Sequence, residues 1–128
     1  MPRRILIADD EASIRRAVRI FIESRSQFEV CEAVDGTDAF DKAVLLNPDL
    51  IVLDLSMPKA NGVEVALLLR NLLPSTPVVL YTMFDEVFGK SPARTLGIGA
   101  VVPKSDGVGN LLGRIEALLK AEDAPQRH

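Results

Sequence analysis

Hydrophobic positions along this chain follow two patterns that alternate with each other. Five short runs are apolar and rich in β-branched residues, and longer stretches between them have apolar residues at every third or fourth position. The short runs predict β-strands, and the longer stretches predict α-helices with one apolar face. The middle runs are apolar at nearly every position, which is typical of strands covered by helices on both sides. The predicted strands are residues 4–8, 29–33, 50–54, 78–82 and 100–103.

The predicted helices follow the strands one by one, but they are not equally regular. The second begins near Thr37 and stops before Asn47, because a residue that precedes a proline resists the helical conformation. The third opens after Asn61, and the fifth spans residues 108–121. The first helix lies between the first two strands. The residues expected to be buried on these four helices are Ile14, Ala17, Val18, Phe21, Ile22, Ala39, Phe40, Ala43, Val44, Leu67, Leu68, Leu69, Leu111, Leu112, Ile115, Leu118 and Leu119.

The fourth helical stretch, residues 84–96, is irregular. It contains both Gly89 and Pro92. An interior proline costs a helix about 3 kcal/mol through a lost hydrogen bond and a ring clash. We therefore expect this helix to be short, late or broken.

Five βα units in sequence predict an α/β fold with a parallel sheet. Right-handed crossovers favour a flavodoxin-like, doubly wound (βα)5 sandwich with strand order 2-1-3-4-5. With 128 residues, of which 48% are hydrophobic, the chain has the usual size of one domain. We expect that domain to span residues 1–121 and to be followed by a flexible tail at 122–128.

Charge and composition narrow the classes of function. A net charge of -3 argues against nucleic-acid binding by this domain itself. The apolar runs are far shorter than the roughly 20 residues of a membrane span, and the N-terminus lacks the pattern of a secretory signal. We therefore predict a cytoplasmic protein with no membrane contact. Cys31, the single cysteine, is expected to be a small buried side chain.

Polar side chains stand where four of the predicted strands end. Asp9 and Asp10 follow the first strand, Asp54 ends the third, Thr82 ends the fourth, and Lys104 follows the fifth. The carboxyl ends of parallel strands form the ligand crevice of such a sheet. Three carboxylates in one place repel one another unless a cation is present. Mg²⁺ prefers such oxygen ligands, so the sequence predicts a Mg²⁺ site formed by the three aspartates.

The same set of residues suggests a phosphoryl acceptor. An aspartate carboxylate can attack phosphorus and become an acyl phosphate when a metal ion screens the phosphate oxygens. Asp54 is the best nucleophile, because it ends the central apolar strand and precedes a loop. Lys104 would stabilise the charge of the transferring group, and the Thr82 hydroxyl would follow a phosphoryl oxygen after transfer. Such a movement would couple the chemistry to a change in the surface.

The motifs ADDE, DLSMPKANG, YT and PK, in this order and spacing, resemble the receiver domains of two-component response regulators. The resemblance covers nearly the whole chain. It implies that Asp9 and Asp10 bind Mg²⁺, that the backbone carbonyl of Ser56 completes the metal site, and that Thr82 and Lys104 contact the phosphoryl group on Asp54. It also implies a histidine kinase or histidine phosphotransfer protein as the donor. The recipient of the signal would be an output domain or a downstream protein.

Three positions depart from the pattern of that family. Val101 stands where receivers usually carry an aromatic switch residue, and Ser105 stands where a proline usually follows the lysine. The sequence therefore does not decide whether the Lys104–Ser105 peptide bond is cis or trans. Met83 occupies a position that commonly holds a small residue, and we expect it to narrow access to Asp54 and to slow phosphorylation or hydrolysis.

Several alternatives stand beside this interpretation. The acids at 9–11 could merely cap the first helix. Arg15, Arg16 and Arg19 would most simply form a solvated helix face, although this helix often helps to dock the histidine donor in receivers.

The chain could be a phosphorylation-independent interaction module, or a Mg²⁺-dependent aspartyl phosphohydrolase. The hydrolase needs a general acid two positions after the nucleophile, where this chain has Ser56. We predict a signalling phosphoacceptor with self-phosphotransfer and autodephosphorylation, not an enzyme with substrate turnover.

Overall fold

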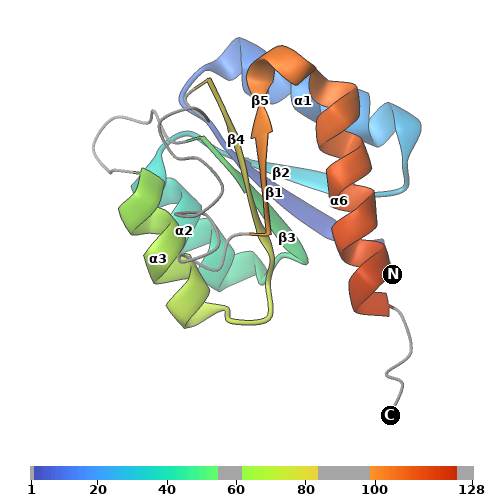
Figure 1. Ribbon diagram of the computed structural model, residues 1–128. Coiled ribbons are helices and arrows are strands. Elements are labelled where there is room, and N and C mark those ends of the chain that lie inside the picture. The colour runs from blue at the N-terminus through green and yellow to red at the C-terminus, as the bar shows by residue number, and fades with distance from the viewer. Residues whose placement is uncertain (1, 55–61, 84–98, 124–128) are drawn as a thin grey trace.

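Parallel strands form one five-stranded sheet with the order β2-β1-β3-β4-β5 (Figure 1). The structure is a computed structural model, which describes residues 2–54, 62–83 and 99–123. Four strands have the predicted bounds, and the third ends one residue earlier than predicted. The strands are β1 (Arg4–Ala8), β2 (Glu29–Ala33), β3 (Leu50–Leu53), β4 (Val78–Thr82) and β5 (Ala100–Pro103).

Helices cover both faces of the sheet, with α1 and α6 on one side and α2 and α3 on the other (Figure 1). Alternate residues of β1 explain the two layers, because Ile5 and Ile7 pack with α1 and α6 while Leu6 packs with α2 and α3. The predicted flavodoxin-like sandwich is thereby confirmed. The helices among the described residues are α1 (Ala12–Arg25), α2 (Gly36–Leu46), α3 (Gly62–Leu72), α6 (Val108–Asp123) and the short 3-10 helix η1 (Lys104–Asp106).

The predicted helix faces are correct for α6 and partly wrong for the others. All five residues expected to be buried on α6 are buried or partly buried. Val44 on α2 is 53% exposed, and Leu67 and Leu68 on α3 are 41% and 54% exposed. Ala17 is also exposed, and Cys31 is only partly buried. A surface helix buries one stripe only, and where neighbouring positions are all apolar the sequence leaves the stripe ambiguous.

Two further predictions on the fold lie wholly or mostly outside the described residues. The irregular fourth helix, predicted at residues 84–96, is one of them. The flexible tail was predicted at residues 122–128, and only its last five residues lie outside. Helix α6 continues to Asp123, so the prediction that the tail begins at residue 122 is wrong by two residues. None of the described helices is both long enough and apolar enough to cross a membrane.

Helix α2 begins with a reciprocal cap. The Asp35 carboxylate accepts a hydrogen bond from the N–H of Asp38 at 2.8 Å, and the Asp38 carboxylate accepts one from the N–H of Val34 at 3.0 Å. Lys42 contacts the same carboxylate at 3.2 Å. Burial opposes ionisation of Asp38, but the Val34 N–H and the Lys42 ammonium favour it, and the balance lowers its pKa below 3.8.

We expect Asp38→Asn to lower the free energy of unfolding at pH 7 by about 0.5–1 kcal/mol, the difference between a charge-assisted and a neutral hydrogen bond. The pKa of Asp38 is lower in the folded protein than in the unfolded chain. The contribution to the free energy of unfolding is therefore present at pH values above the unfolded-state pKa, and it is lost as the pH falls through the folded-state pKa. Urea titrations from pH 7 to pH 3 would follow it. Asp41→Asn, at an exposed site on the same helix, is the control. A difference that is independent of pH would contradict the prediction.

Candidate functional site

Three carboxylates meet at the carboxyl ends of two neighbouring strands. Asp9 and Asp10 follow β1, and Asp54 follows β3, which pairs with β1. The N–H of Asp54 donates to the carbonyl of Ala8 at 3.0 Å, which extends the pairing by one residue. Oxygen atoms of the three carboxylates lie within 4.8 Å of one another. Asp9 and Asp54 are 2% and 4% exposed, whereas Asp10 is exposed.

Lys104 joins two of these acids. Its Nζ lies 2.8 Å from Oδ2 of Asp9 and 3.2 Å from Oδ2 of Asp54. Burial by itself would lower the pKa of Lys104, but the hydrogen bonds and charges of the two carboxylates outweigh burial and raise that pKa above its ordinary value. The ammonium is therefore charged at neutral pH, and it partly offsets the repulsion between the acids.

The charge and the ligand type of the cluster fit a divalent cation. Three carboxylates and one ammonium leave two negative charges at the site. All of the carboxylate donors are hard oxygen atoms, which Mg²⁺ prefers, and the exposed Asp10 leaves the cluster open to water. The residues that are present can therefore hold Mg²⁺.

Thr82 lies between the strand ends that carry Asp54 and Lys104, because β4 lies between β3 and β5. Its side chain is fully buried. The next residue, Met83, is 64% exposed. It lines a cavity of about 530 Å³ beside the site, together with Tyr81, Lys104, Glu11, Ile14, Ala17, Val18 and Val108. Met83 therefore stands at the rim of the site.

The structure also describes the other two positions at which the sequence departs from the receiver pattern, Val101 and Ser105. Val101 is partly buried and packs with the α2 and α3 layer. The Lys104–Ser105 bond, whose geometry the sequence left open, is trans, like every other peptide bond of the described residues. Ser56, predicted to offer its carbonyl to the metal, lies outside the described residues.

The acids at 9–11 do more than cap α1. Glu11 is the N-cap residue of α1, and its side chain makes no capping hydrogen bond. Oδ1 of Asp9 instead accepts a hydrogen bond from the N–H of Glu11 at 2.9 Å. Asp9 thus orders the loop with one oxygen and contacts Lys104 with the other. The capping-only interpretation is wrong.

Sequence reasoning missed the contacts of Arg15. We expected a solvated helix face, which holds for the exposed Arg16. The Arg15 side chain, however, is only 12% exposed; its Nη1 donates to the carbonyl of Asp9 at 2.8 Å, and its Nε lies 3.0 Å from Oε1 of Glu32. Arg19 contacts the other oxygen of Glu32 at 2.8 Å. Glu32, the second glutamate of the apolar run FEVCEAV, was the signal that could have revealed this contact.

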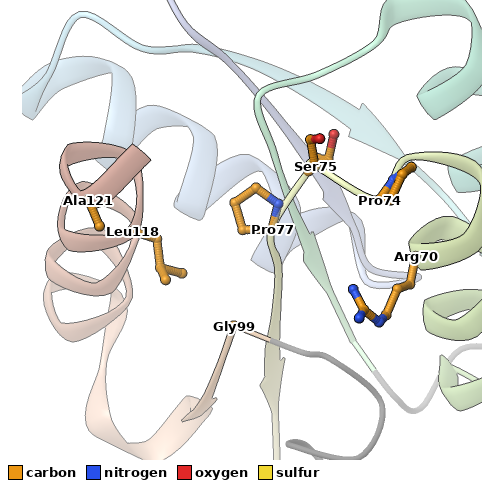
Figure 2. Close-up of a pocket in the computed structure, with 8 residues that line it drawn as sticks. Arg70, Pro74, Ser75, Pro77, Gly99, Leu118 and Ala121 are labelled. Carbon is orange, nitrogen blue, oxygen red and sulfur yellow. The ribbon is translucent and has the colours of Figure 1, made fainter. Parts of the chain in front are cut away.

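A second cavity, of about 360 Å³, lies at the opposite ends of β4 and β5 (Figure 2). Leu118 and Ala121 line it from α6, and Arg70 lines it from α3. Pro77 and Gly99, which directly precede β4 and β5, lie between them. Among the residues that the structure describes, no predicted site residue lines this cavity. The predicted acidic and basic residues gather instead at the carboxyl ends of the strands.

Comparison with known proteins gives a consistent result. A family model described as the response regulator receiver domain matches residues 5–116. The alkaline phosphatase synthesis transcriptional regulatory protein PhoP of Bacillus subtilis (strain 168) is 36% identical over 96% of this chain and 51% of its own length. The response regulator MprA of Mycobacterium sp. (strain KMS) is 34% identical over 94% of this chain and 52% of its own length. The chain thus spans about half the length of these curated relatives.

Solved structures agree with the sequence matches. A CheY-like response regulator receiver domain protein from Methanospirillum hungatei JF-1 covers 96% of this chain and 98% of its own, with a TM-score of 0.86; at 23% identity it supports the fold alone. The response regulator TrrA of Thermotoga maritima, solved in complex with Mg(2+)-BeF, is 28% identical. It has a TM-score of 0.82 and covers 91% of this chain and 98% of its own.

The bridge formed by Lys104 can be tested without any ligand. Lys104→Met removes the cation that Asp9 and Asp54 share, and we expect it to lower the free energy of unfolding by roughly 3 kcal/mol, the cost of breaking a buried ion pair from one side. Urea titration in metal-free buffer measures this loss. Lys120→Met, at an exposed position of α6, should change it little. Equal losses in both variants would show that the bridge is not stabilising.

Proposed function

This chain belongs to the response regulator receiver domain family, and we propose that it accepts a phosphoryl group on Asp54 from the phosphohistidine of a histidine kinase or histidine phosphotransfer protein. The observation that carries this proposal is the contact of one lysine with two buried aspartates beside a third acid. The Asp54 carboxylate lies beside the Lys104 ammonium at the carboxyl end of the sheet, where the ammonium can offset the negative charge of an incoming phosphoryl group.

The transfer exchanges one bond to phosphorus for another. An oxygen of Asp54 forms a bond to phosphorus while the phosphorus–nitrogen bond to the donor imidazole breaks, and the imidazole keeps the electron pair. Asp9, Asp10, Asp54 and the carbonyl of Ser56 would hold Mg²⁺, which would screen the phosphoryl oxygens when bound. Lys104 neutralises charge on the transferring group. The hydroxyl of Thr82 donates to a phosphoryl oxygen once the group has arrived.

Two relatives of known structure support the choice of ligand. TrrA of Thermotoga maritima was solved with Mg(2+)-BeF, and the DrrB receiver domain was solved in a BeF3-activated form. Beryllium fluoride is a tetrahedral stand-in for a phosphoryl group. We infer that this chain also binds Mg²⁺ and a phosphoryl group together.

The output of the switch is part of the same proposal. PhoP is a transcriptional regulatory protein and is about twice the length of this chain. We propose that phosphorylation of Asp54 changes a surface that contacts an output domain or a separate downstream protein, inside the cytoplasm. Because Val101 replaces the usual aromatic switch residue, Thr82 would transmit the change without an aromatic rotation.

Intact-mass spectrometry after incubation with acetyl phosphate tests the acceptor directly. We expect one phosphoryl adduct that requires Mg²⁺ and is abolished by Asp54→Asn or by a chelator. Asp41→Asn, at an exposed site, should be phosphorylated like the wild type. No adduct under any condition would favour the phosphorylation-independent module. Continuous release of phosphate from phosphate esters would favour the hydrolase.

The exposed side chain of Met83 gives a second test. If it covers the approach of water to the phosphorylated Asp54, Met83→Ala should raise the autodephosphorylation rate by roughly threefold, about 0.7 kcal/mol in the barrier. Loss of the adduct over time would be followed by mass spectrometry. Leu45→Ala, at a site that is 80% exposed on α2, is the matched control. Identical decay in Met83→Ala and wild type would remove this role.

A further inference from the structure

The side chain of Arg15 connects strand β2 to the loop that carries two of the acids. Its Nη1 donates to the backbone carbonyl of Asp9 at 2.8 Å, and its Nε donates to Oε1 of Glu32 at 3.0 Å. We propose that Arg15, held by Glu32, is a positioning residue that sets the Asp9–Asp10 loop for Mg²⁺ binding. This inference rests on the proposed function, because it assumes that the acidic cluster binds Mg²⁺.

The contact acts at the peptide bond between the two acids. The carbonyl that Arg15 holds belongs to the peptide unit that joins Asp9 to Asp10, and this unit is planar. Fixing its oxygen atom therefore restricts the orientation of both residues. The N–H of Asp9 donates to the carbonyl of Ala33 at 3.2 Å, and the N–H of Glu11 donates to the Asp9 carboxylate at 2.9 Å. The N–H groups of Asp9 and Glu11 thus fix the loop on either side of the Asp9–Asp10 peptide, and Arg15 fixes the carbonyl of that peptide itself.

The orientation of Arg15 is itself fixed. A guanidinium is planar, so its Nε and Nη1 contacts cannot move independently. Glu32 lies on the same side of the sheet as α1, since Val30, two positions earlier in β2, packs in the α1 and α6 layer. Its second carboxylate oxygen is held by Arg19 at 2.8 Å. The exposed fractions of the Arg15 and Glu32 side chains are 12% and 22%, so both are largely shielded from water.

Charge alone predicts the opposite effect from positioning. The guanidinium of Arg15 is a positive charge close to a cation site, and by simple Coulomb repulsion its removal would tighten Mg²⁺ binding. If Arg15 instead orients the ligands, its removal weakens binding, as the loss of groups that orient metal ligands generally does. The direction of the change therefore separates the two roles. A purely structural ion pair would alter the unfolding free energy and leave the Mg²⁺ affinity of the folded protein unchanged.

Isothermal titration calorimetry of the full chain with Mg²⁺ tests this inference. We expect Arg15→Met and Arg15→Lys each to raise the Mg²⁺ Kd about tenfold. The lysine variant keeps the positive charge, but its single ammonium cannot contact the Asp9 carbonyl and the Glu32 carboxylate in the geometry of a planar guanidinium. Glu32→Gln should raise the Kd less, and the double variant Arg15→Met with Glu32→Gln should bind no worse than Arg15→Met alone. Arg16→Met, at the exposed neighbouring position, should stay within about twofold of the wild type.

Two further readouts complete the test. The phosphorylation rate of the Arg15 variants should return towards that of the wild type at saturating Mg²⁺, and amide hydrogen exchange at Asp10 and Glu11 should speed up without metal. If Arg15→Met does not fold, Arg15→Lys and Glu32→Gln carry the test. Wild-type affinity, or tighter binding, in folded Arg15 variants would overturn the inference. Absence of Mg²⁺ binding by the wild type would instead overturn the proposed function.

Discussion

Electrostatic repulsion among three carboxylates is the constraint on which the rest of this structure depends. One carboxylate oxygen from each of Asp9, Asp10 and Asp54 lies within 4.8 Å of the other two, and two of these residues are buried. Like charges so close together are costly unless cations compensate them. Lys104 supplies one positive charge inside the cluster, and two negative charges remain. The cluster therefore keeps a net negative charge, which a divalent cation would offset.

The fold supports this cluster from two sides. Pairing of β1 with β3 brings the acids together, and the end of β5 carries Lys104 to them across the end of β4. On the other side, Arg15 links the loop after β1 to Glu32 on β2. Lys104 acts on the carboxylates themselves, whereas Arg15 acts on the backbone that carries two of them. Binding of a cation and a phosphoryl group would change the contacts of Lys104 with the carboxylates. The contact of Arg15 with the Asp9 backbone would stay in place.

Prediction from the sequence worked where the physical signal is local, and it failed where the signal depends on neighbouring elements. Buried parallel strands are apolar on both faces, so their positions were visible to within one residue. Runs such as Leu67–Leu68–Leu69 left the buried stripe undefined, and only packing on the sheet selected Leu69, which is 1% exposed. The contact of Arg15 with Asp9 was missed for a similar reason, since an arginine on a helix usually faces water.

The sequence by itself determined the order of the elements, the layers of the sandwich and the acidic, hydroxyl and basic residues at the strand ends. Those features follow from periodicity and from the rule that ligands bind at the carboxyl ends of parallel strands. Only the tertiary structure decided that Lys104 bridges Asp9 and Asp54, that Lys104–Ser105 is trans, and that Arg15 holds the Asp9 carbonyl. The Lys104 and Arg15 contacts join residues from different elements, and their distances depend on how the helices and strands pack. The Lys104–Ser105 bond joins neighbouring residues, and the sequence left its geometry undecided because a serine follows the lysine where receivers usually have a proline.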